Sequence, residues 1–252
     1  MICGHITSRA NRLVRELRTL GTSRRDRYKE KAFICDGIKL LGEAIQSGIK
    51  IRYIFLEEGC DINKDWIECY TVYTAPRELM EYISTLECTQ GVIFCCEMPE
   101  QGELCGEQII MLDHLQDTGN LGTILRCADA FGISGVVLDG CADPYNPKTV
   151  RAAMGSLFRV RMCTMAINDA IDALKEKDIL SYAATLTDKA VSIDNVSMKR
   201  AAVVIGNEGN GVSQEVENHC AGHIILPMSG VTESLNASIA AGIVMWEMQK
   251  AR

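Results

Sequence analysis

Residues 108–138, QIIMLDHLQDTGNLGTILRCADAFGISGVVL, predict one strand–helix–strand unit. The runs QIIML (108–112) and GVVL (135–138) are almost wholly apolar, which is typical of strands buried on both faces of a sheet. In 120–131 the apolar residues recur at helical spacing, so this segment predicts an amphipathic helix. A strand, a helix and a second strand in this order predict a parallel pair within an α/β fold.

The same alternation continues to the end of the chain. Further strands are expected at RVRM (159–162), SYAATL (181–186), AAVVIG (201–206) and HIILP (223–227). An arm is expected around 148–158, and helices are expected over 166–177, from Ser213 and from about Ser234. We therefore expect a parallel sheet with helices on both faces. Ligands of such sheets bind at the carboxyl ends of the strands, which selects the loops 113–122, 206–212 and 227–236.

The first part of the chain predicts a smaller α/β unit. Its expected strands are AFIC (32–35), IRYIFL (51–56), TVYT (71–74) and GVIFCC (91–96). Asp36 is expected to cap a helix that ends at Gly48, and Pro76 is expected to begin another. Residues 97–107 are polar and acidic and carry a Pro and two Gly, as linkers do. The predicted division is 1–96, a linker at 97–107, and 108–252.

Length and composition restrict the class of protein. A chain of 252 residues that is 47% hydrophobic can bury one large core or two modest ones. The chain contains no run of 18 apolar residues, so no membrane helix is predicted. The first residues lack the pattern of a signal peptide, and we therefore expect a cytoplasmic protein. The 12 cysteines form no C-x-x-C pair. We expect buried free thiols in a reducing cytoplasm and no metal, with a zinc site as the alternative.

The charge is unevenly distributed. A net charge of −7 argues by itself against nucleic acid, but the first 31 residues carry nine basic and three acidic groups. A second basic cluster contains Lys148, Arg151, Arg159 and Arg161 without an intervening acid. Two basic patches on an acidic protein indicate a polyanion bound at a defined place. A solvated helix face is the common alternative, but the excess of Arg over Lys favours phosphate contact.

The loop GNEGNGVS (206–213) indicates a nucleoside ligand. Its three glycines allow close approach of a ligand to the backbone, but it lacks the lysine of a phosphate-binding P-loop. Glu208 would repel phosphates. S-adenosylmethionine, a nucleoside without phosphates and with a cationic sulfonium, therefore fits better than ATP or NAD. A tight turn with Asn and Gly in left-handed conformations is the alternative.

Two further features mark the other loops. Arg126 follows Gly122 by four residues, so on a helix its side chain lies over a bare turn where a ligand could reach it, with Asn120 at the helix start. The alternative is an ion pair of Arg126 with Asp129 or another acid. In the segment 226–242, Ser234 is either a functional hydroxyl or an N-cap, and the small residues that follow it allow close packing.

Taken together, these segments resemble the SpoU family of RNA ribose 2'-O-methyltransferases in the SPOUT superfamily. The matching motifs are QDTGNLGTILRCADAFG, VVIGNEGNGVS and ILPMSGVTESLNASIAAGI, and VRAAMGSLFRV resembles a further family segment. Residues 6–45 are similar to the start of the family's N-terminal substrate-binding domain. The resemblance implies an α/β-knot, in which the parallel sheet of 108–252 contains a trefoil knot. It also implies a homodimer with an active site built from both subunits.

The resemblance also implies site residues. The implied catalytic residues are Arg126, Asn120, Glu208, Ser234 and Asn236. S-adenosyl-L-methionine is expected to bind, largely through backbone groups, at Thr185, Leu186, Gly206, Asn207, Glu208, Gly209, Ile225, Leu226, Pro227, Met228, Ser234, Leu235 and Asn236. The residues expected to bind RNA are Arg9, Arg12, Arg15, Arg24, Arg25, Lys148, Arg151 and Arg159.

The expected activity is 2'-O-methylation of ribosomal RNA, because a separate N-terminal domain favours that substrate over transfer RNA. The family proposal gives deprotonation of the ribose hydroxyl to the arginine that matches Arg126. A guanidinium with a pKa above about 12 suits electrostatic stabilisation better. Transfer RNA, a base-methylating enzyme, a resistance enzyme and an inactive RNA-binding protein remain alternatives.

Overall fold

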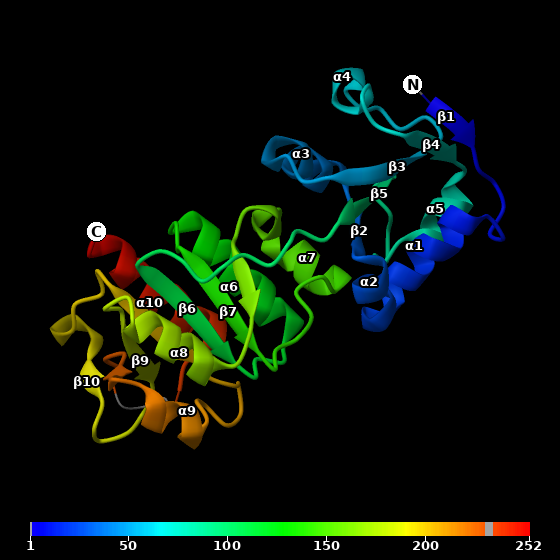
Figure 1. The fold of residues 1–252 in the computed structure, drawn as a ribbon. Helices are drawn as coiled ribbons and strands as arrows, with labels where there is room; N and C mark the ends of the chain where they lie inside the picture. The colour runs from blue at the N-terminus through cyan, green and yellow to red at the C-terminus, as the bar shows by residue number, and fades with distance from the viewer. Residues whose placement is uncertain (1, 230–233) are drawn as a thin grey trace. The chain divides into compact units, whose positions relative to one another are not determined.

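The computed structural model describes residues 2–229 and 234–252, and the chain forms two compact units (Figure 1). The first unit contains residues 1–100 and 143–158, and the second contains residues 101–142 and 159–252. The chain therefore passes between the units three times. The functional division into 1–96, 97–107 and 108–252 stays a prediction.

The first unit is built on a mixed five-stranded sheet. Its strand order is β1 (Ile2–His5), β4 (Val72–Ala75), β3 (Ile51–Glu57), β5 (Val92–Glu97) and β2 (Ala32–Asp36). β5 runs antiparallel to both of its neighbours, and the other pairs are parallel. The helices of this unit are α1 (Arg12–Thr22), α2 (Arg24–Glu30), α3 (Ile38–Ser47), α4 (Lys64–Ile67) and α5 (Arg77–Ile83).

Most expected elements of this unit are confirmed, and one capping residue is wrong. The four expected strands and the two expected helices are present, and Gly48 ends α3 in a left-handed conformation. Asp36 does not cap α3, because Gly37 occupies the N-cap position. The Asp36 carboxylate instead accepts a hydrogen bond from the Ser84 hydroxyl. Four further elements, β1, α1, α2 and α4, were not predicted from the sequence.

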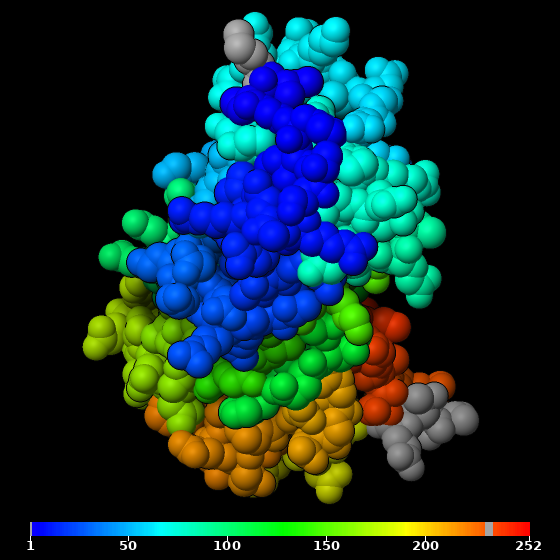
Figure 2. Space-filling model, turned by 90° about the vertical axis from the view of Figure 1, so that its right-hand side faces the viewer, coloured from blue at the N-terminus to red at the C-terminus, as the bar shows by residue number. Residues whose placement is uncertain are grey.

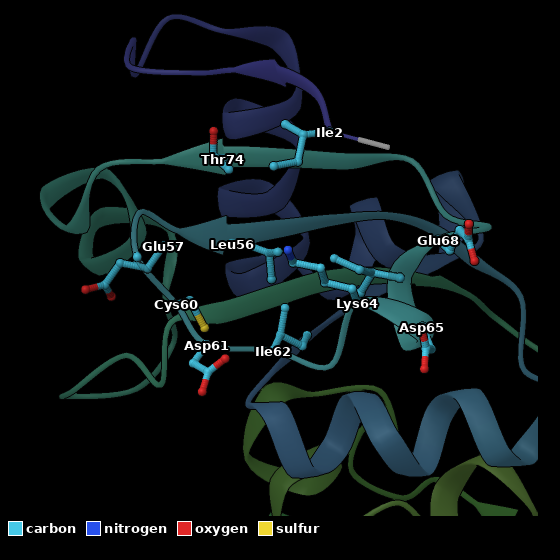
Figure 3. A pocket seen from close by; sticks show the side chains of 12 residues that line it. Ile2, Leu56, Glu57, Cys60, Asp61, Ile62, Lys64, Asp65, Glu68 and Thr74 are labelled. Carbon is cyan, nitrogen blue, oxygen red and sulfur yellow. The ribbon is translucent and has the colours of Figure 1, made fainter.

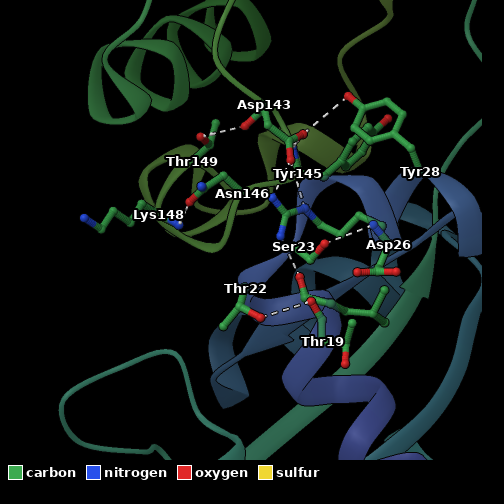
Figure 4. Close-up of polar contacts among 12 residues, drawn as sticks. Thr19, Thr22, Ser23, Asp26, Tyr28, Asp143, Tyr145, Asn146, Lys148 and Thr149 are labelled. Atoms are coloured by element: carbon green, nitrogen blue, oxygen red, sulfur yellow. Dashed lines mark hydrogen bonds and ion pairs between the residues drawn. The ribbon is translucent and has the colours of Figure 1, made fainter.

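Residues 143–158 belong to the first unit although they follow β7 of the second. They form α7 (Pro147–Ala153) and the 3-10 helix η1 (Ser156–Phe158). A buried ion pair holds them: Arg27 donates to Asp143 from Nε at 2.8 Å and from Nη2 at 2.6 Å (Figure 4). The Phe33 ring packs on the Tyr145 ring with centroids 4.9 Å apart. This segment is thus part of the core of the first unit.

The second unit is the parallel α/β fold that its apolar strands predicted. Its seven strands are all parallel. Their order is β10 (Val191–Ser192), β12 (Gly222–Ile225), β9 (Leu180–Ala184), β11 (Ala201–Ile205), β6 (Gln108–Asp113), β7 (Gly135–Asp139) and β8 (Met162–Thr164). α6 (Thr118–Ala130) and α10 (Ala237–Lys250) cover one face, and α8 (Ile167–Lys175) and α9 (Gln214–His219) cover the other (Figure 1). The short 3-10 helix η2 (Ile193–Asn195) follows β10.

Two boundaries in this unit differ from expectation. The strand expected at 159–162 is β8, which begins only at Met162, because the chain is still turning out of the 3-10 helix η1 at Arg159 and Val160. The last helix begins at Ala237 and its N-cap is Asn236, so Ser234 is not the cap. No helix within the described residues is long and apolar enough to cross a membrane. The trefoil knot stays a prediction.

Candidate functional site

The loop after β11 is joined to the start of α6 by the carboxylate of Glu208. This carboxylate accepts hydrogen bonds from the backbone N–H of Gln116 at 3.2 Å and of Asp117 at 3.0 Å. It also accepts one from Asn120 Nδ2 at 3.2 Å. Asp117 caps α6 by accepting from the backbone N–H of Asn120 at 2.7 Å. β6 and β11 are neighbours in the sheet, so their carboxyl ends place these loops side by side.

The third loop joins the same network through Asn236. Asn236 Nδ2 donates to Asn120 Oδ1 at 3.0 Å. Asn236 Oδ1 accepts from the backbone N–H groups of Ser238 and Ile239 and from the Ser238 hydroxyl at 2.6 Å. Three of the expected catalytic side chains, from three loops, therefore form one hydrogen-bonded chain in the order Glu208, Asn120, Asn236.

The loop 206–211 closes on itself. Asn207 and Gly211 exchange two backbone hydrogen bonds of 2.9 Å, and Asn207 Oδ1 accepts from the N–H of Gly209 at 2.9 Å. Asn207 Nδ2 donates to the carbonyl of His114 at 2.8 Å. A Cβ atom on Gly206 would lie 2.0 Å from the Gly211 carbonyl carbon, so only glycine fits there. The loop is a tight turn, as the alternative interpretation held, but only Gly211 in it is left-handed, with φ +70°, and neither Asn207 nor Asn210 is. Its closure determines which backbone groups a ligand can meet.

Arg126 is exposed on α6, and the expected alternative of a pair with Asp129 is wrong. Asp129 is bound by Arg159, whose Nε and Nη2 lie 3.0 Å and 2.7 Å from Asp129 Oδ2. With the residues that the structure describes, Arg126 makes neither a hydrogen bond nor an ion pair. It lies six residues beyond Asn120 in the same helix, about 9 Å along the axis. A permanent cation on the helix that carries Asn120 is available to an anionic group of a ligand.

Titration at the site is shifted at two residues. Burial raises the pKa of Glu208, but hydrogen bonds from the backbone and from Asn120 together hold that pKa below its ordinary value. Glu208 is therefore ionised at neutral pH and accepts all of these bonds. His114 Nδ1 lies 2.7 Å from Asp113 Oδ1, and this hydrogen bond raises the pKa of His114.

Asp113 and His114 are site residues that the sequence analysis did not identify. The other oxygen of Asp113 accepts from the N–H of Ser213 at 2.7 Å, so it holds the end of the 206–213 loop. The carbonyl of His114 accepts from Asn207. His114 has φ +55°, a left-handed conformation that its sequence context does not signal. These residues build the loop framework rather than present free groups.

The remaining expected cofactor residues lie at two neighbouring strand ends. β9 and β12 are paired, and the N–H of Thr185 donates to the carbonyl of Ile224 at 3.0 Å. Thr185 and Leu186 therefore lie beside the segment 225–228. Ser234 is exposed and makes no hydrogen bond with the described residues, so nothing joins it to the Glu208 network. Gly230, part of the third motif, lies outside the described residues.

The expected RNA-binding arginines lie on or next to α1 and α2 of the first unit. Arg9, Arg12, Arg15, Arg24 and Arg25 are exposed and form no ion pair with the described residues. Arg27 also belongs to the basic segment, but its charge is buried against Asp143. Lys148 and Arg151 are exposed on α7, whereas Arg159 is paired with Asp129.

Neither the 12 cysteines nor the residues that line the cavity in Figure 3 belong to the three loops. All 12 cysteines are free thiols; four are buried and three are exposed. Among the described residues, no group of three His, Cys, Asp or Glu is placed to hold a metal ion. The cavity, of about 450 Å³, lies in the first unit at the ends of β3 and β4, lined by residues such as Leu56, Cys60 and Lys64 (Figure 3). None of its lining residues belongs to the three motifs.

Comparison with known proteins identifies the family. A model described as the SpoU rRNA Methylase family matches residues 107–246, and one described as the MRM3-like substrate binding domain matches residues 11–93. The chain is 30% identical to the 23S rRNA (guanosine(2553)-2'-O)-methyltransferase RlmP of Bacillus subtilis, over 97% of this chain and 98% of that protein. It is 29% identical to the mitochondrial rRNA methyltransferase 3A of Danio rerio, over 94% of this chain and 68% of that protein.

A solved structure agrees with both units. The AdoMet-bound rRNA methyltransferase from Sinorhizobium meliloti is similar with a TM-score of 0.86 and 28% identity, and the match covers 98% of this chain and 97% of that one. The family model, the full-length relative and the three linked loops point to the same group of proteins. The chain belongs to the SpoU rRNA Methylase family.

Proposed function

We propose that this protein transfers a methyl group from S-adenosyl-L-methionine to a ribose 2'-hydroxyl of ribosomal RNA. The observation that carries the proposal is the exposed Arg126, without an ion-pair partner among the described residues, on the helix whose start is held by the Glu208–Asn120–Asn236 network. Family membership, the AdoMet-bound structure from Sinorhizobium meliloti and the 23S rRNA named for the Bacillus subtilis relative support it.

The residues at the strand ends suit a nucleoside sulfonium. The one carboxylate in the loop 206–211, that of Glu208, is already bonded to N–H groups, and the loop has no lysine for a phosphate. We assign cofactor binding to Thr185, Leu186, the segment 206–209, the segment 225–228 and the segment 234–236. When bound, the sulfonium supplies a methyl group that is already activated for displacement.

Arg126 acts on the acceptor. Its guanidinium donates to an RNA phosphate and stabilises the negative charge that develops on the ribose oxygen. It does not remove the proton, because a guanidinium keeps its own proton below a pH of about 12. Asn120 is a positioning residue, because its amide oxygen and its nitrogen are both bonded to other protein groups.

The protein divides these tasks between its parts. Residues 1–96 hold the RNA through Arg9, Arg12, Arg15, Arg24 and Arg25, and residues 108–252 carry out the transfer. Lys148 and Arg151 extend the basic surface, while Arg159 contributes less because Asp129 neutralises it. Free cysteines accord with a reducing compartment such as the cytoplasm.

We further propose that the protein acts as a homodimer. α10 presents Ile239, Ile243 and Trp246 at spacings of four and three residues on one face, with exposed fractions of 55%, 38% and 49%. Such an apolar face on a helix is typical of an interface. Sedimentation should give a dimer for the wild type and a shift towards monomer for Ile243→Asp. A monomeric wild type would contradict the dimer.

The activity is tested with isotope-labelled S-adenosylmethionine and two acceptors, total ribosomal RNA and total transfer RNA. After digestion to nucleosides, mass spectrometry should find the label on a 2'-O-methyl nucleoside from the ribosomal RNA. A labelled base would identify a base methyltransferase, and label confined to transfer RNA would change the substrate. If calorimetry with S-adenosylmethionine detected no binding, an inactive RNA-binding protein would be favoured instead.

A further inference from the structure

Two arginines of the first unit share one aromatic ring. The guanidinium carbon of Arg9, in the segment before α1, lies 4.5 Å from the centroid of the Tyr82 ring. That of Arg18, on α1, lies 4.9 Å from the same centroid. Tyr82 is on α5, so three separate segments meet at this point. We call Arg9, Arg18 and Tyr82 the Tyr82 clamp.

The two guanidinium groups differ from other arginines of the same unit. Arg52 is engaged with Glu97 at 3.5 Å, and Arg77 donates to Glu81 at 3.0 Å. Arg9 and Arg18 form no ion pair with any described residue, although their positions are determined by the ring. A ring face attracts a cation without neutralising its charge. Both groups therefore keep their N–H donors free for an anion.

The ring itself is held firmly. Tyr82 is half-buried and packs against the core cluster formed by residues such as Leu17, Leu20 and Met80. Its hydroxyl makes no hydrogen bond with the described residues. The aromatic face is thus the part of Tyr82 that its neighbours use. The N-terminal residues around the clamp lie at the molecular surface (Figure 2, blue).

We propose that the Tyr82 clamp is a preorganised phosphate site of the RNA-binding surface and that Tyr82 is its positioning residue. A free arginine loses much side-chain freedom when it binds a phosphate. Stacking on Tyr82 restricts both guanidinium groups before RNA arrives, so less freedom is lost on binding. This proposal rests on the proposed function, because it assumes that the ligand of the first unit is RNA.

The experiment compares variants of the full chain by fluorescence anisotropy with a fluorescein-labelled RNA hairpin of defined sequence. Tyr82→Leu should raise the Kd about three- to tenfold, and Tyr82→Phe should keep the wild-type Kd because the ring remains. Tyr73→Leu is the matched control: Tyr73 packs on the same core cluster, and no described arginine lies over its ring. Its Kd should equal that of the wild type.

Two further readouts separate positioning from a structural effect. Tyr82→Leu should have no effect on the Kd in an Arg9→Ala/Arg18→Ala background, because the groups that it positions are absent. Each arginine replaced should lower the slope of log Kd against log salt by about 0.7–0.9, the value for one phosphate contact. In methyl transfer, Tyr82→Leu should raise KM for RNA and leave kcat unchanged.

The proposal is overturned if Tyr82→Leu binds the hairpin like Tyr73→Leu, if Tyr82→Phe fails to restore binding, or if the effect persists without both arginines. Failure of the proposed function has a different signature. A wild type that binds the hairpin with the expected variant pattern, yet methylates no RNA, removes the activity and leaves the clamp in place.

Discussion

Among single residues, Asn120 and Arg126 differ in whether their side chains are hydrogen-bonded, although both belong to the first motif on α6. The Asn120 side chain is bonded at its oxygen to Asn236 and at its nitrogen to Glu208. Arg126 has neither a hydrogen bond nor an ion pair within the described residues. The residue with occupied groups can determine geometry, and the residue with free groups can meet a ligand. Substitutions at the two positions should therefore fail in different ways.

Replacing Arg126 with alanine should abolish methyl transfer, with a loss of at least about 100-fold, because charge stabilisation in the transition state is removed. Calorimetry should give nearly unchanged S-adenosylmethionine affinity. Arg200→Ala is the control, since Arg200 is an arginine of the same unit that already donates to Glu107 at 2.7 Å. Wild-type turnover in Arg126→Ala would contradict any role for this residue in the transfer.

Replacing Gly206 with alanine should open the loop 206–211. The added Cβ would lie 2.1 Å from the Val212 nitrogen, and such overpacking costs about 1–3 kcal/mol. The temperature of thermal unfolding and the affinity for S-adenosylmethionine should both decrease. At Gly209, a Cβ would meet only the Asn207 Oδ1 atom, at 3.6 Å, so Gly209→Ala should be mild. Equal effects at the two glycines would argue against the closed-loop explanation.

Whole elements meet at the site through their first residues. α6 is capped by Asp117 and α10 by Asn236. The N–H of Asp117 donates to Glu208 directly, and Asn236 is linked to Glu208 through Asn120. The site is thus made at the points where helices begin and parallel strands end. Its integrity depends on caps as much as on the catalytic side chains.

Asn236→Ala should destabilise the protein by about 1 kcal/mol, the usual effect of losing an N-cap, and should also break the bond to Asn120. Asn236→Asp keeps the cap acceptor but loses the N–H donor. The aspartate should therefore restore stability in denaturant unfolding without restoring full activity. If it restored both, the bond to Asn120 would have no functional role.

The carboxylate of Glu208 connects the loop 206–211 to the start of α6, so the stability of this connection depends on pH. Its folded pKa lies below the ordinary 4.5, so its contribution is present above that pH and is lost as the pH falls through the lowered value. Glu208→Gln should lower stability at neutral pH, and the difference from wild type should shrink below pH 4.5. Unfolding of both proteins, measured at neutral pH and below pH 4.5, tests this prediction. A constant difference would assign the effect to shape rather than charge.

Local patterns predicted the parallel strands and helices of the second unit, because buried strands and amphipathic helices have periods that a sequence displays. The resemblance to the SpoU family selected Asn120, Glu208 and Asn236 together, and the structure joins these three side chains. Local patterns did not locate α1, although its buried residues Val14, Leu17 and Leu20 recur at helical spacing, or α2, whose only buried residue is the charged Arg27. The pairing of Asp129 with Arg159, 30 residues away, could not be predicted, because it depends on tertiary contact.

For the whole molecule, the buried pair of Arg27 and Asp143 joins segments 116 residues apart. Arg27→Met or Asp143→Leu alone should cost about 3–5 kcal/mol, because each leaves an uncompensated buried charge. The double variant Arg27→Met/Asp143→Leu should be much less destabilised than the sum of the two. Denaturant unfolding of the four proteins completes the cycle. Additive losses would mean that the two charges do not stabilise each other.

The return of residues 143–158 to the first unit also sets the order in which the protein can be completed during synthesis. The first 100 residues leave the ribosome without α7. Arg27 has no carboxylate until Asp143 emerges, and Phe33 lacks the second of its covering rings, Tyr145 and Phe158, until residue 158 emerges. In most multidomain proteins the N-terminal domain is synthesised completely, and can fold, before the next domain emerges. Here the strands β6 and β7 of the second unit are made while the first unit is still incomplete, so the two must mature together.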